Sequence, residues 1–531
     1  MKKSFLSKNI FLPVFILIMA VNIYAGGGNQ SQNSSVAVPG AVKKFSILNQ
    51  CLADHSIPPD IDPNNNKWAN IFKKELPDID INWIIVEPNL YLEKQNVLVG
   101  SGDIPDVQIM TMTQMIQWSD QGIIRNIDGM YQTSYKNIYN FLTEDDLIST
   151  RYNNHTYGIK VPGNRLENPQ MMYIRTDWLD RVNLPAPKTI DELYNVLKAF
   201  TFNDPDGNGQ NDTYGLAGCY SGTAGFDYMW QIFSSFGVQQ GENFTKVGNQ
   251  IIPDFIRPEM RNAVEFLARL YSDGILDKDS LVMNGSQLED KAVRGTIGLF
   301  GIYTNGLAAR AYPNMLKANP NAKVAMFTPV PAPDGNIYTP VGRNGGRMYG
   351  ISSRCNVPEA VLYFFNWMIE QDTSTLPYYT LNADKVYNGV LGVDTIPLGD
   401  KFILEKPQGT LSPEAFVDLY RYSYRTHMGT MQAVSDDILF QITQARVDQG
   451  LIDPIFLTCQ QFASKYGKTN AVAVTGPVYA EYMNDISTYW QETIANIVTG
   501  SKPITAFDDF VKFFYANGGQ KIIDEVTALN E

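Results

Sequence analysis

One short acidic stretch has the residue types and spacing of a calcium-binding loop. Ca²⁺ prefers six to eight oxygen ligands, and the EF-hand loop supplies them from alternate positions along the chain. Gly209 falls at the sixth position, where such a loop turns sharply. Three carboxylates this close together repel one another unless a cation lies between them. The predicted ligands of this loop, residues 204–213, are Asp204, Asp206, Asn208, the backbone carbonyl of Gln210, Asp212 and Thr213.

The loop departs from an EF-hand at its twelfth position. That position is Gly215, whereas an EF-hand has a bidentate Glu there. The pattern therefore predicts a static structural calcium clip rather than a calcium switch, with Thr213, a water or a distant group completing the shell. A hydrated turn is the alternative, because turns use Asp, Asn and Gly freely.

Aromatic rings near turns suggest a second kind of site. Flat rings beside polar groups suit the faces of sugars, and a planar guanidinium suits hydroxyl or anionic groups. Core packing of the rings and surface exposure of the arginines are the alternatives. The candidate ligand-binding residues are Trp118, Arg165, Tyr220, Trp230, Tyr303 and Arg343.

Enzyme chemistry has little support from motifs. The three histidines do not have the H-x-x-x-H spacing of a zinc hydrolase, and no G-x-S-x-G elbow or G-x-x-x-x-G-K-[ST] phosphate loop is present. A glycosidase needs only two carboxylates that meet in space, which the 55 acidic residues leave open. We therefore expect no catalytic residues and no enzymatic activity.

Composition places the chain among folded proteins with more than one lobe. It has 531 residues, 44% of them apolar, and a formal net charge of −13. A length of this order exceeds one comfortable core, and the net acidity argues against a nucleic-acid partner.

The first residues predict an export signal. Lys2 and Lys3 precede an apolar run over residues 10–21, which is too short to span a bilayer, and Ala25 suits cleavage. We assign residues 1–25 to a signal peptide and 26–43 to a flexible linker. A lipid anchor would need a Cys directly after the apolar run, so the absence of one there favours a free periplasmic protein. The four cysteines, whose disulfide state stays open, are Cys51, Cys219, Cys355 and Cys459.

Hydrophobic patterns alternate between strand and helix in the first two thirds of the chain. Expected strands cover residues 45–48, 79–86, 107–110, 171–174, 251–256, 295–300 and 324–328. Expected helices cover 66–75, 91–100, 177–182, a segment starting at 189, 258–273, 357–371, 413–422, 439–448, 476–499 and 506–517. This order is typical of an α/β fold with mostly parallel sheets.

Several ordered segments resemble extracellular solute-binding protein family 1 of ABC importers, especially its large LplA-like and alginate-binding members. The matching segments are Ser101–Asp106, Gln121–Asp128, Met172–Leu179, Pro187–Leu193, Asp204–Leu216, Ile497–Gly500 and Phe507–Phe510.

The resemblance implies a two-lobed periplasmic binding protein fold of type II, with a hinge and a ligand cleft between the lobes. By analogy, lobe 1 is 44–158 and 294–346, lobe 2 is 159–293 and 347–531, and the chain crosses between them at 157–162 and 347–352. The acidic loop corresponds to the calcium loop of the subgroup, with Thr213 where alginate-binding relatives have an acidic residue. The resemblance also implies a monomer that binds a carbohydrate of oligosaccharide size and delivers it to the transmembrane subunits of an ABC permease.

Two other functions remain as alternatives. A secreted glycan-active hydrolase or lyase would turn over its sugar and would need two carboxylates about 5–10 Å apart. A glycan-binding adhesion module without a transport role would present a flat patch and no hinge closure.

Overall fold

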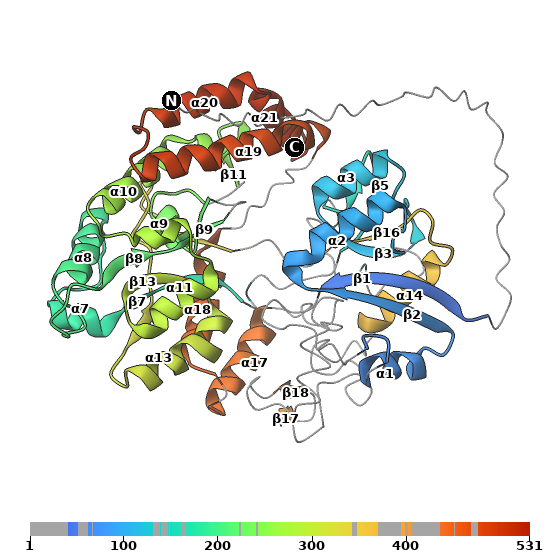
Figure 1. Ribbon diagram of the computed structural model, residues 1–531, viewed down its shortest axis with the longest axis horizontal. Helices are drawn as coiled ribbons and strands as arrows, with labels where there is room; N and C mark the ends of the chain where they lie inside the picture. Colours follow the sequence, from blue (N-terminus) through green and yellow to red (C-terminus); the bar gives the residue numbers. More distant parts are fainter. Residues whose placement is uncertain are drawn as a thin grey trace, which may run out of the picture. The chain divides into compact units, whose positions relative to one another are not determined.

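The computed structural model describes most of the chain outside its first 40 residues (Figure 1). The chain divides into Met1–Ala41 and a compact unit, Val42–Glu531, which holds all the described helices and strands. The signal peptide and most of the predicted linker lie outside the described residues. The described ranges are 41–50, 62–65, 67–130, 149–160, 168–221, 225–239, 243–341, 348–369, 395–398, 402–405, 436–450, 452–468 and 476–530, with residues 139, 147 and 166.

A first sheet has the strand order β2-β1-β3-β16-β6. Strand β1 pairs in parallel with both β2 and β3, whereas β16 is antiparallel to β3 and to β6. Residue Met348 of β16 lies opposite Lys160 of β6, although 188 positions separate them in the sequence. The bounds are β1 Lys43–Gln50, β2 Ile79–Val86, β3 Val107–Met110, β6 Gly158–Lys160 and β16 Met348–Ile351.

Helices cover both faces of the first sheet (Figure 1). On one face, α1 and α14 pack onto the strands through aromatic rings, with the Phe364 ring 5.6 Å from Phe72 and 6.0 Å from Trp83. On the other face, the Tyr91 hydroxyl of α2 donates to the Leu48 carbonyl of β1. The bounds are α1 Lys67–Glu75, α2 Pro88–Ser101, α3 Met112–Asp120 and α14 Pro358–Ile369.

A second sheet has the order β14-β7-β13-β8. Strand β13 is parallel to β8 and antiparallel to β7, so this sheet is mixed as well. All residues of β13 except its last are buried, which fits a continuous apolar strand at the centre of a sheet. The bounds are β7 Gln170–Arg175, β8 Tyr214–Ala217, β13 Ile297–Tyr303 and β14 Val324–Met326.

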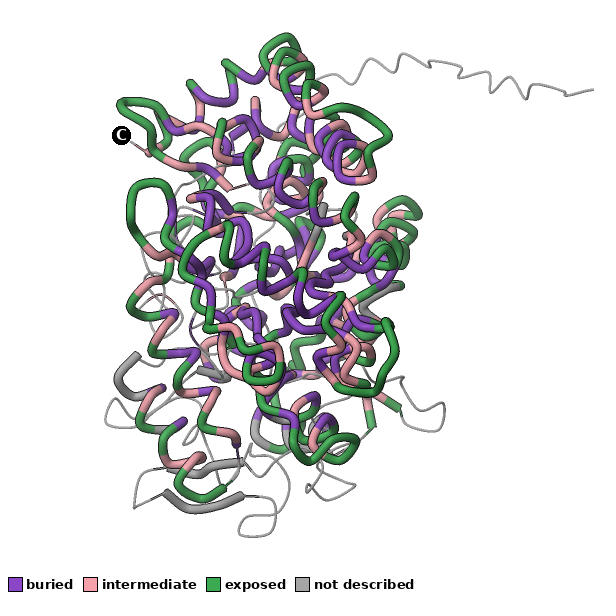
Figure 2. The backbone as a smooth tube through the Cα atoms, turned by 90° about the vertical axis from the view of Figure 1, so that its left-hand side faces the viewer, coloured by how far each residue is buried: buried purple, intermediate pink, exposed green. Residues whose placement is uncertain are grey.

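The helices around the second sheet include the C-terminal ones. Phe255 is fully buried and packs against Phe510, Phe514 and Trp490, at ring separations of 5.7, 5.7 and 6.1 Å. Buried and exposed stretches alternate along the surrounding chain (Figure 2). The bounds are α7 Thr176–Val182, α8 Ile190–Phe202, α10 Pro258–Ser272, α11 Gly285–Arg294, α12 Thr304–Gly306, α13 Tyr312–Ala318, α17 Asp436–Asp448, α18 Ile455–Tyr466, α19 Pro477–Val498, α20 Ala506–Ala516 and α21 Gly519–Ala528.

Small elements complete the described part of the chain. Two-stranded pairings join β4 to β5, β9 to β10, β11 to β12, β15 to β19 and β17 to β18. Their bounds are β4 Arg151–Tyr152, β5 His155–Thr156, β9 Cys219–Ser221, β10 Gly225–Asp227, β11 Phe244–Val247, β12 Gln250–Pro253, β15 Thr339–Pro340, β17 Thr395–Leu398, β18 Phe402–Glu405 and β19 Gly467–Lys468, with short helices α9 Trp230–Ser234, η1 Asp254–Ile256, η2 Lys278–Leu281 and η3 Leu307–Ala311.

The strand pairing differs from the expected division of the chain. Residues 294–346 were assigned to the first lobe, but β13 and β14 from this range pair with β7 and β8 of the second sheet. Residues from 347 onwards were assigned to the second lobe, yet β16 and α14 complete the first sheet and its core. The two predicted crossing segments are neighbouring strands of the first sheet, β6 and β16.

Most expected elements of the α/β pattern are present, with a few local differences. The sheets are mixed rather than mostly parallel. The expected strand 251–256 is β12 followed by the 3-10 turn η1, and the expected helix 413–422 lies outside the described residues.

Three of the four cysteines lie in the described part of the chain and form no disulfide. Cys219, Cys355 and Cys459 are free and buried. Burial raises the pKa of the Cys355 thiol to about 11 and that of the Cys459 thiol to about 12, which keeps both protonated and unreactive at neutral pH.

Removing the Phe255 ring tests whether the C-terminal helices belong to the second core. We expect Phe255→Ala to lower the free energy of unfolding by about 3–5 kcal/mol, because the cavity lies among well-packed rings. Leu90→Ala is the control, since Leu90 is 47% exposed on α2, and its effect should stay within about 0.5 kcal/mol. Chemical denaturation measures both. Equal effects of the two variants would contradict this packing.

Candidate functional site

Three aromatic rings meet where β10 leads into α9 and where β13 ends. The Trp230 ring centroid lies 4.9 Å from that of Tyr228 and 5.7 Å from that of Tyr303. Tyr228 and Tyr303 are 6.2 Å apart and nearly perpendicular. Trp230 is only 5% exposed, whereas Tyr303 is 39% exposed. We call these three residues the aromatic cluster, and its open side is the side of Tyr303.

The second sheet holds Tyr303 in place. Tyr303 is the last residue of β13 and lies opposite Gln170 of β7, whose side-chain amide donates to the Tyr303 hydroxyl at 2.7 Å. Because β13 and β8 are parallel, their carboxyl ends lie at the same edge of the sheet. Ligands of open α/β sheets bind outside the carboxyl ends of the strands, so the aromatic cluster stands where a ligand is expected.

Close backbone packing positions Tyr228. A β-carbon on Gly301 of β13 would lie 2.1 Å from the Tyr228 carbonyl oxygen, so only glycine allows this approach. Tyr228 itself has φ +63°, a left-handed conformation that is rare for a bulky residue. Backbone strain of this kind persists where surrounding structure enforces it, and it concentrates at functional sites.

A carboxylate lies within the aromatic cluster. Asp227 accepts a 2.8 Å hydrogen bond from the Tyr228 backbone N–H and a second one from the Trp230 side chain. Burial raises the pKa of Asp227 in spite of these two bonds. Opposite it in the hairpin is Cys219, whose thiol pKa burial raises to about 12, so that thiol stays neutral.

The predicted ligand-binding residues do not form one site. Trp230 and Tyr303 meet in the aromatic cluster, whereas Trp118 is 6% exposed and packs in the core between α3 and the first sheet. Arg165 and Arg343 lie outside the described residues. Sequence reasoning missed Tyr228 of the aromatic cluster and the polar neighbours of the cluster, Asp227 and Gln170. The adjacency of Asp227 and Tyr228 to Trp230 is the one signal that could have found them.

Tyr220 lies apart from the aromatic cluster. It follows Cys219 in β9 and therefore points to the opposite face of the hairpin from Asp227. There it lines a hollow of about 330 Å³ together with Leu281 and residues Glu492, Ala495 and Asn496 of α19. The Tyr220 hydroxyl donates to the Gln491 carbonyl at 2.9 Å. The volume suits a small ligand, but the hollow has one ring and no strained backbone.

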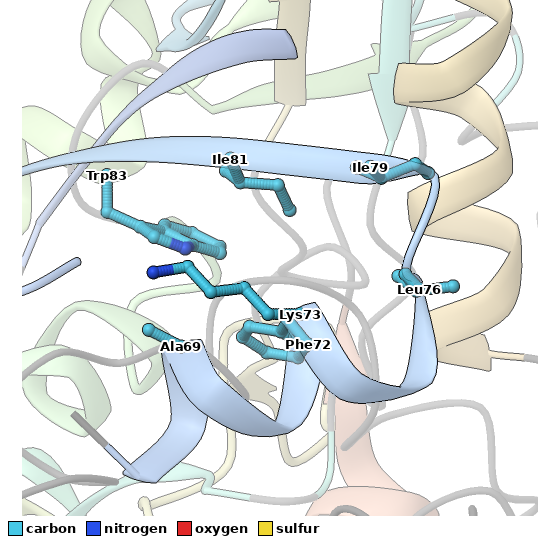
Figure 3. Close-up of a pocket in the computed structure, with 7 residues that line it drawn as sticks. All are labelled: Ala69, Phe72, Lys73, Leu76, Ile79, Ile81 and Trp83. Carbon is cyan, nitrogen blue, oxygen red and sulfur yellow. The ribbon is translucent and has the colours of Figure 1, made fainter. Parts of the chain in front are cut away.

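A hollow between α1 and β2 is too small for a ligand (Figure 3). Its volume is about 10 Å³, and Trp83 and Phe72 line it together with the stem of Lys73. This space holds at most one water. It is a packing defect in the first core.

The acidic loop folds around the side chain of Asn208. The Asn208 amide donates to Asp206 at 2.9 Å and to both carboxylate oxygens of Asp212 at 3.3 Å. Asp204 accepts from the backbone N–H groups of Asn208 and Gly209 at 3.0 and 3.1 Å. Two carboxylates, those of Asp206 and Asp212, thus accept from the Asn208 side-chain amide, and the third, Asp204, accepts from the backbone next to it.

Burial, hydrogen bonds and neighbouring charges shift the pKa values of two carboxyl groups in the loop. Burial, the hydrogen bond to Asp204 and the charges of Asp212 and Asp204 raise the pKa of Asp206. Burial opposes ionisation of Asp204 too, but hydrogen bonds led by the Gly209 N–H lower its pKa overall. These oxygens suit a hard cation, although no three His, Cys, Asp or Glu side chains in the described ranges stand in metal-holding geometry. The Thr213 hydroxyl is buried and donates to the Phe200 carbonyl at 2.8 Å.

Comparison with known proteins identifies the family. A model of the bacterial extracellular solute-binding protein family matches residues 60–373. The chain belongs to this family. No helix in the described part of the chain is long and apolar enough to cross a membrane.

Two curated relatives come from Bacillus subtilis strain 168. The polygalacturonan/rhamnogalacturonan-binding protein YtcQ is 26% identical over 382 residues, covering 70% of this chain and 72% of YtcQ. The lipoprotein LipO is 25% identical over 556 aligned positions, covering 100% of this chain and 99% of LipO.

Solved structures share the fold. The S. pneumoniae ABC-transporter substrate-binding protein FusA in complex with kestose gives a TM-score of 0.66 at 18% identity, covering 92% of this chain and 98% of FusA. A FusA EF-hand mutant with fructo-nystose gives 0.64, also at 18% identity and with the same coverage. The alginate-binding protein AlgQ2 without calcium ion gives 0.65 at 18% identity, covering 93% and 99%. The predicted α/β solute-binding fold and family are therefore confirmed.

Replacing Asp227 tests whether burial of its ionised carboxylate lowers the stability of the folded protein. Because the folded state raises the pKa of Asp227, the folded state disfavours the charged form, and this cost is present at pH 7. We expect Asp227→Asn to raise the melting temperature at pH 7. The gain should fade as the pH drops towards the ordinary Asp pKa of 3.8, where the wild-type carboxyl becomes neutral.

Asp485→Asn is the matched control, because Asp485 is an exposed carboxylate on α19 and the substitution makes the same change in net charge. Melting curves of the three proteins between pH 4 and pH 7 measure the effect. A gain of the same size in Asp485→Asn would assign it to net charge rather than to burial of Asp227.

Proposed function

We propose that this chain is the carbohydrate-binding protein of an ABC importer and that the aromatic cluster is part of its sugar site. The observation that carries the proposal is the meeting of Trp230, Tyr228 and the exposed Tyr303 with Asp227 and Gln170 at the carboxyl edge of the second sheet. Rings offer flat apolar faces to sugar C–H groups, while the carboxylate and amide bind hydroxyls. The printed ligands of YtcQ, FusA and AlgQ2, which are all carbohydrates, support the same class.

The strand pairing supports a revised division into lobes. One lobe would comprise residues 43–160 and 348–369, and the other 170–326 and 436–530. The chain would cross between them next to β6 and β16, which lie side by side and form a natural hinge. Ligand that contacts both lobes would favour the closed state, which the permease subunits would recognise. In this function the protein acts as a periplasmic monomer and breaks no bond in the sugar.

Truncating Tyr303 tests the sugar site. A thermal-shift panel of mono- and oligosaccharides first finds a ligand, and product analysis checks that it is recovered intact. We expect Tyr303→Ala to weaken binding of that sugar at least tenfold by calorimetry, or about 1.4 kcal/mol, because ring and hydroxyl contacts are both lost.

Tyr363→Ala is the control for this experiment, because Tyr363 is 43% exposed on α14, away from the aromatic cluster. It should bind like the wild type. Unchanged affinity in Tyr303→Ala would remove the aromatic cluster from the proposed site, and a cleaved sugar would point to a glycan-active enzyme instead.

We also propose that the acidic loop binds a structural calcium ion. The residues that would hold it are Asp204, Asp206, Asn208, Asp212 and the Gln210 carbonyl. The three carboxylates among them all accept hydrogen bonds from N–H groups of Asn208. The ion would replace the Asn208 amide as the positive partner of the carboxylates and would clip the end of α8 to the start of β8. The EF-hand mutant of FusA and the calcium-free form of AlgQ2 support a loop of this type in the fold.

Melting with and without calcium tests the clip. We expect added Ca²⁺ to raise the melting temperature of the chelator-treated protein by several degrees, because the ion binds the folded loop only. Asp206→Asn should abolish most of this shift, whereas Asp103→Asn, an exposed carboxylate after α2, should keep it. A wild-type midpoint that ignores calcium would reject the ion.

A further inference from the structure

The charge of the aromatic cluster is negative, as far as the described residues define it. Burial raises the pKa of the Tyr228 hydroxyl, and the charges of the adjacent Asp227 and of Glu289 on α11 raise it further. Glu289 forms a two-pronged ion pair with Arg310, with both N–O distances at 2.7 Å, so the Arg310 charge is already balanced. Asp227 has no such partner.

Both groups that bind Asp227 are neutral. They are the Tyr228 backbone N–H and the indole N–H of Trp230, and no cationic side chain among the described residues forms an ion pair with Asp227. Two N–H groups leave further lone pairs on the carboxylate, which can accept from the hydroxyls of a ligand. Asp227 is half-buried rather than fully enclosed, and it directly precedes Tyr228, whose ring lies 6.2 Å from that of the exposed Tyr303.

We infer that the aromatic cluster selects neutral sugar rings and rejects uronic acids. This inference rests on the proposed carbohydrate site and names its substrate class. A neutral ring presents hydroxyl donors to Asp227 and C–H groups to the aromatic faces. A uronate would place a second carboxylate beside the half-buried Asp227, with no cation among the described residues to balance the two charges.

The selectivity would separate this chain from some of its relatives. YtcQ is named for polygalacturonan and AlgQ2 for alginate, and both polymers are built of uronic acids. FusA is named for fructo-oligosaccharides, which are neutral. Proteins of the same fold thus bind both charged and neutral carbohydrates, and the local charge of the binding site decides which of the two is bound.

Two carbohydrate panels test the inference. One contains neutral fructo-, malto-, galacto- and xylo-oligosaccharides, and the other contains oligogalacturonides, oligoalginates and oligoglucuronides. Oligogalacturonides are included with and without full methyl esterification, so that one pair differs only in its carboxylate charge. Melting shifts find the ligands, and calorimetry at pH 7 gives their affinities. We expect the stabilising ligands to be neutral, with uronates at least tenfold weaker.

Asp227→Asn then tests the cause. We expect it to raise the affinity for uronates relative to neutral sugars by about tenfold, because the repelling charge is gone while an amide remains to bind hydroxyls. Asp485→Asn makes the same change in net charge on α19 and should leave this ratio unchanged. A ratio that is the same in Asp227→Asn as in the wild type would overturn the assigned role of Asp227.

The outcomes distinguish a failure of the charge selectivity from a failure of the proposed function. Tight binding of a uronate by the wild type would overturn the inference and leave the carbohydrate site standing. If no sugar in either panel binds, the proposed function is overturned, and the inference with it.

Discussion

The pairing of β16 with β3 and β6 is the constraint on which the architecture depends. This short strand inserts between two strands that precede it by about two hundred residues, and it is buried along its whole length. The chain must therefore leave the first sheet after β6, build the second sheet and return at β16. Lys160, where the chain leaves this sheet, and Met348, where it re-enters, are paired residues on neighbouring strands.

The second sheet carries the aromatic cluster because β13, one of its two inner strands, ends at an aromatic residue. Strand β13 is held on both sides, by β7 and by β8, so Tyr303 is delivered to the sheet edge with little freedom. Gly301 two residues earlier admits the Tyr228 backbone, and Trp230 fills the space behind. Rigid placement matters for a receptor, because a ring that is already ordered loses little conformational entropy when it binds.

The sequence predicts features formed by residues close together in the chain, but it does not predict features that depend on pairing between distant strands. The spacing of the acidic loop is contained within ten residues, and the structure does bring its carboxylates together. Trp230 and Tyr303 were each recognisable as rings near segment ends, but their meeting depends on a ladder between β7 and β13, far apart in the sequence. The same cause explains why the strand pairing differs from the expected division of the chain, since an apolar run such as 297–302 fits either sheet equally well. Asp227 had no motif to mark it among 55 acidic residues.

The acidic loop and the aromatic cluster use carboxylates in opposite ways. In the loop, several charges gather on an exposed turn and hydrogen-bond to N–H groups, an arrangement that a cation would complete. In the cluster, a single carboxylate is partly buried among rings, and its two neutral donors only partly offset the cost of burial. Asp227 keeps lone pairs that can accept further hydrogen bonds, and no cationic side chain among the described residues pairs with it. Under the proposed function, such a carboxylate would favour ligands that donate hydrogen bonds, as neutral, hydroxyl-rich molecules do.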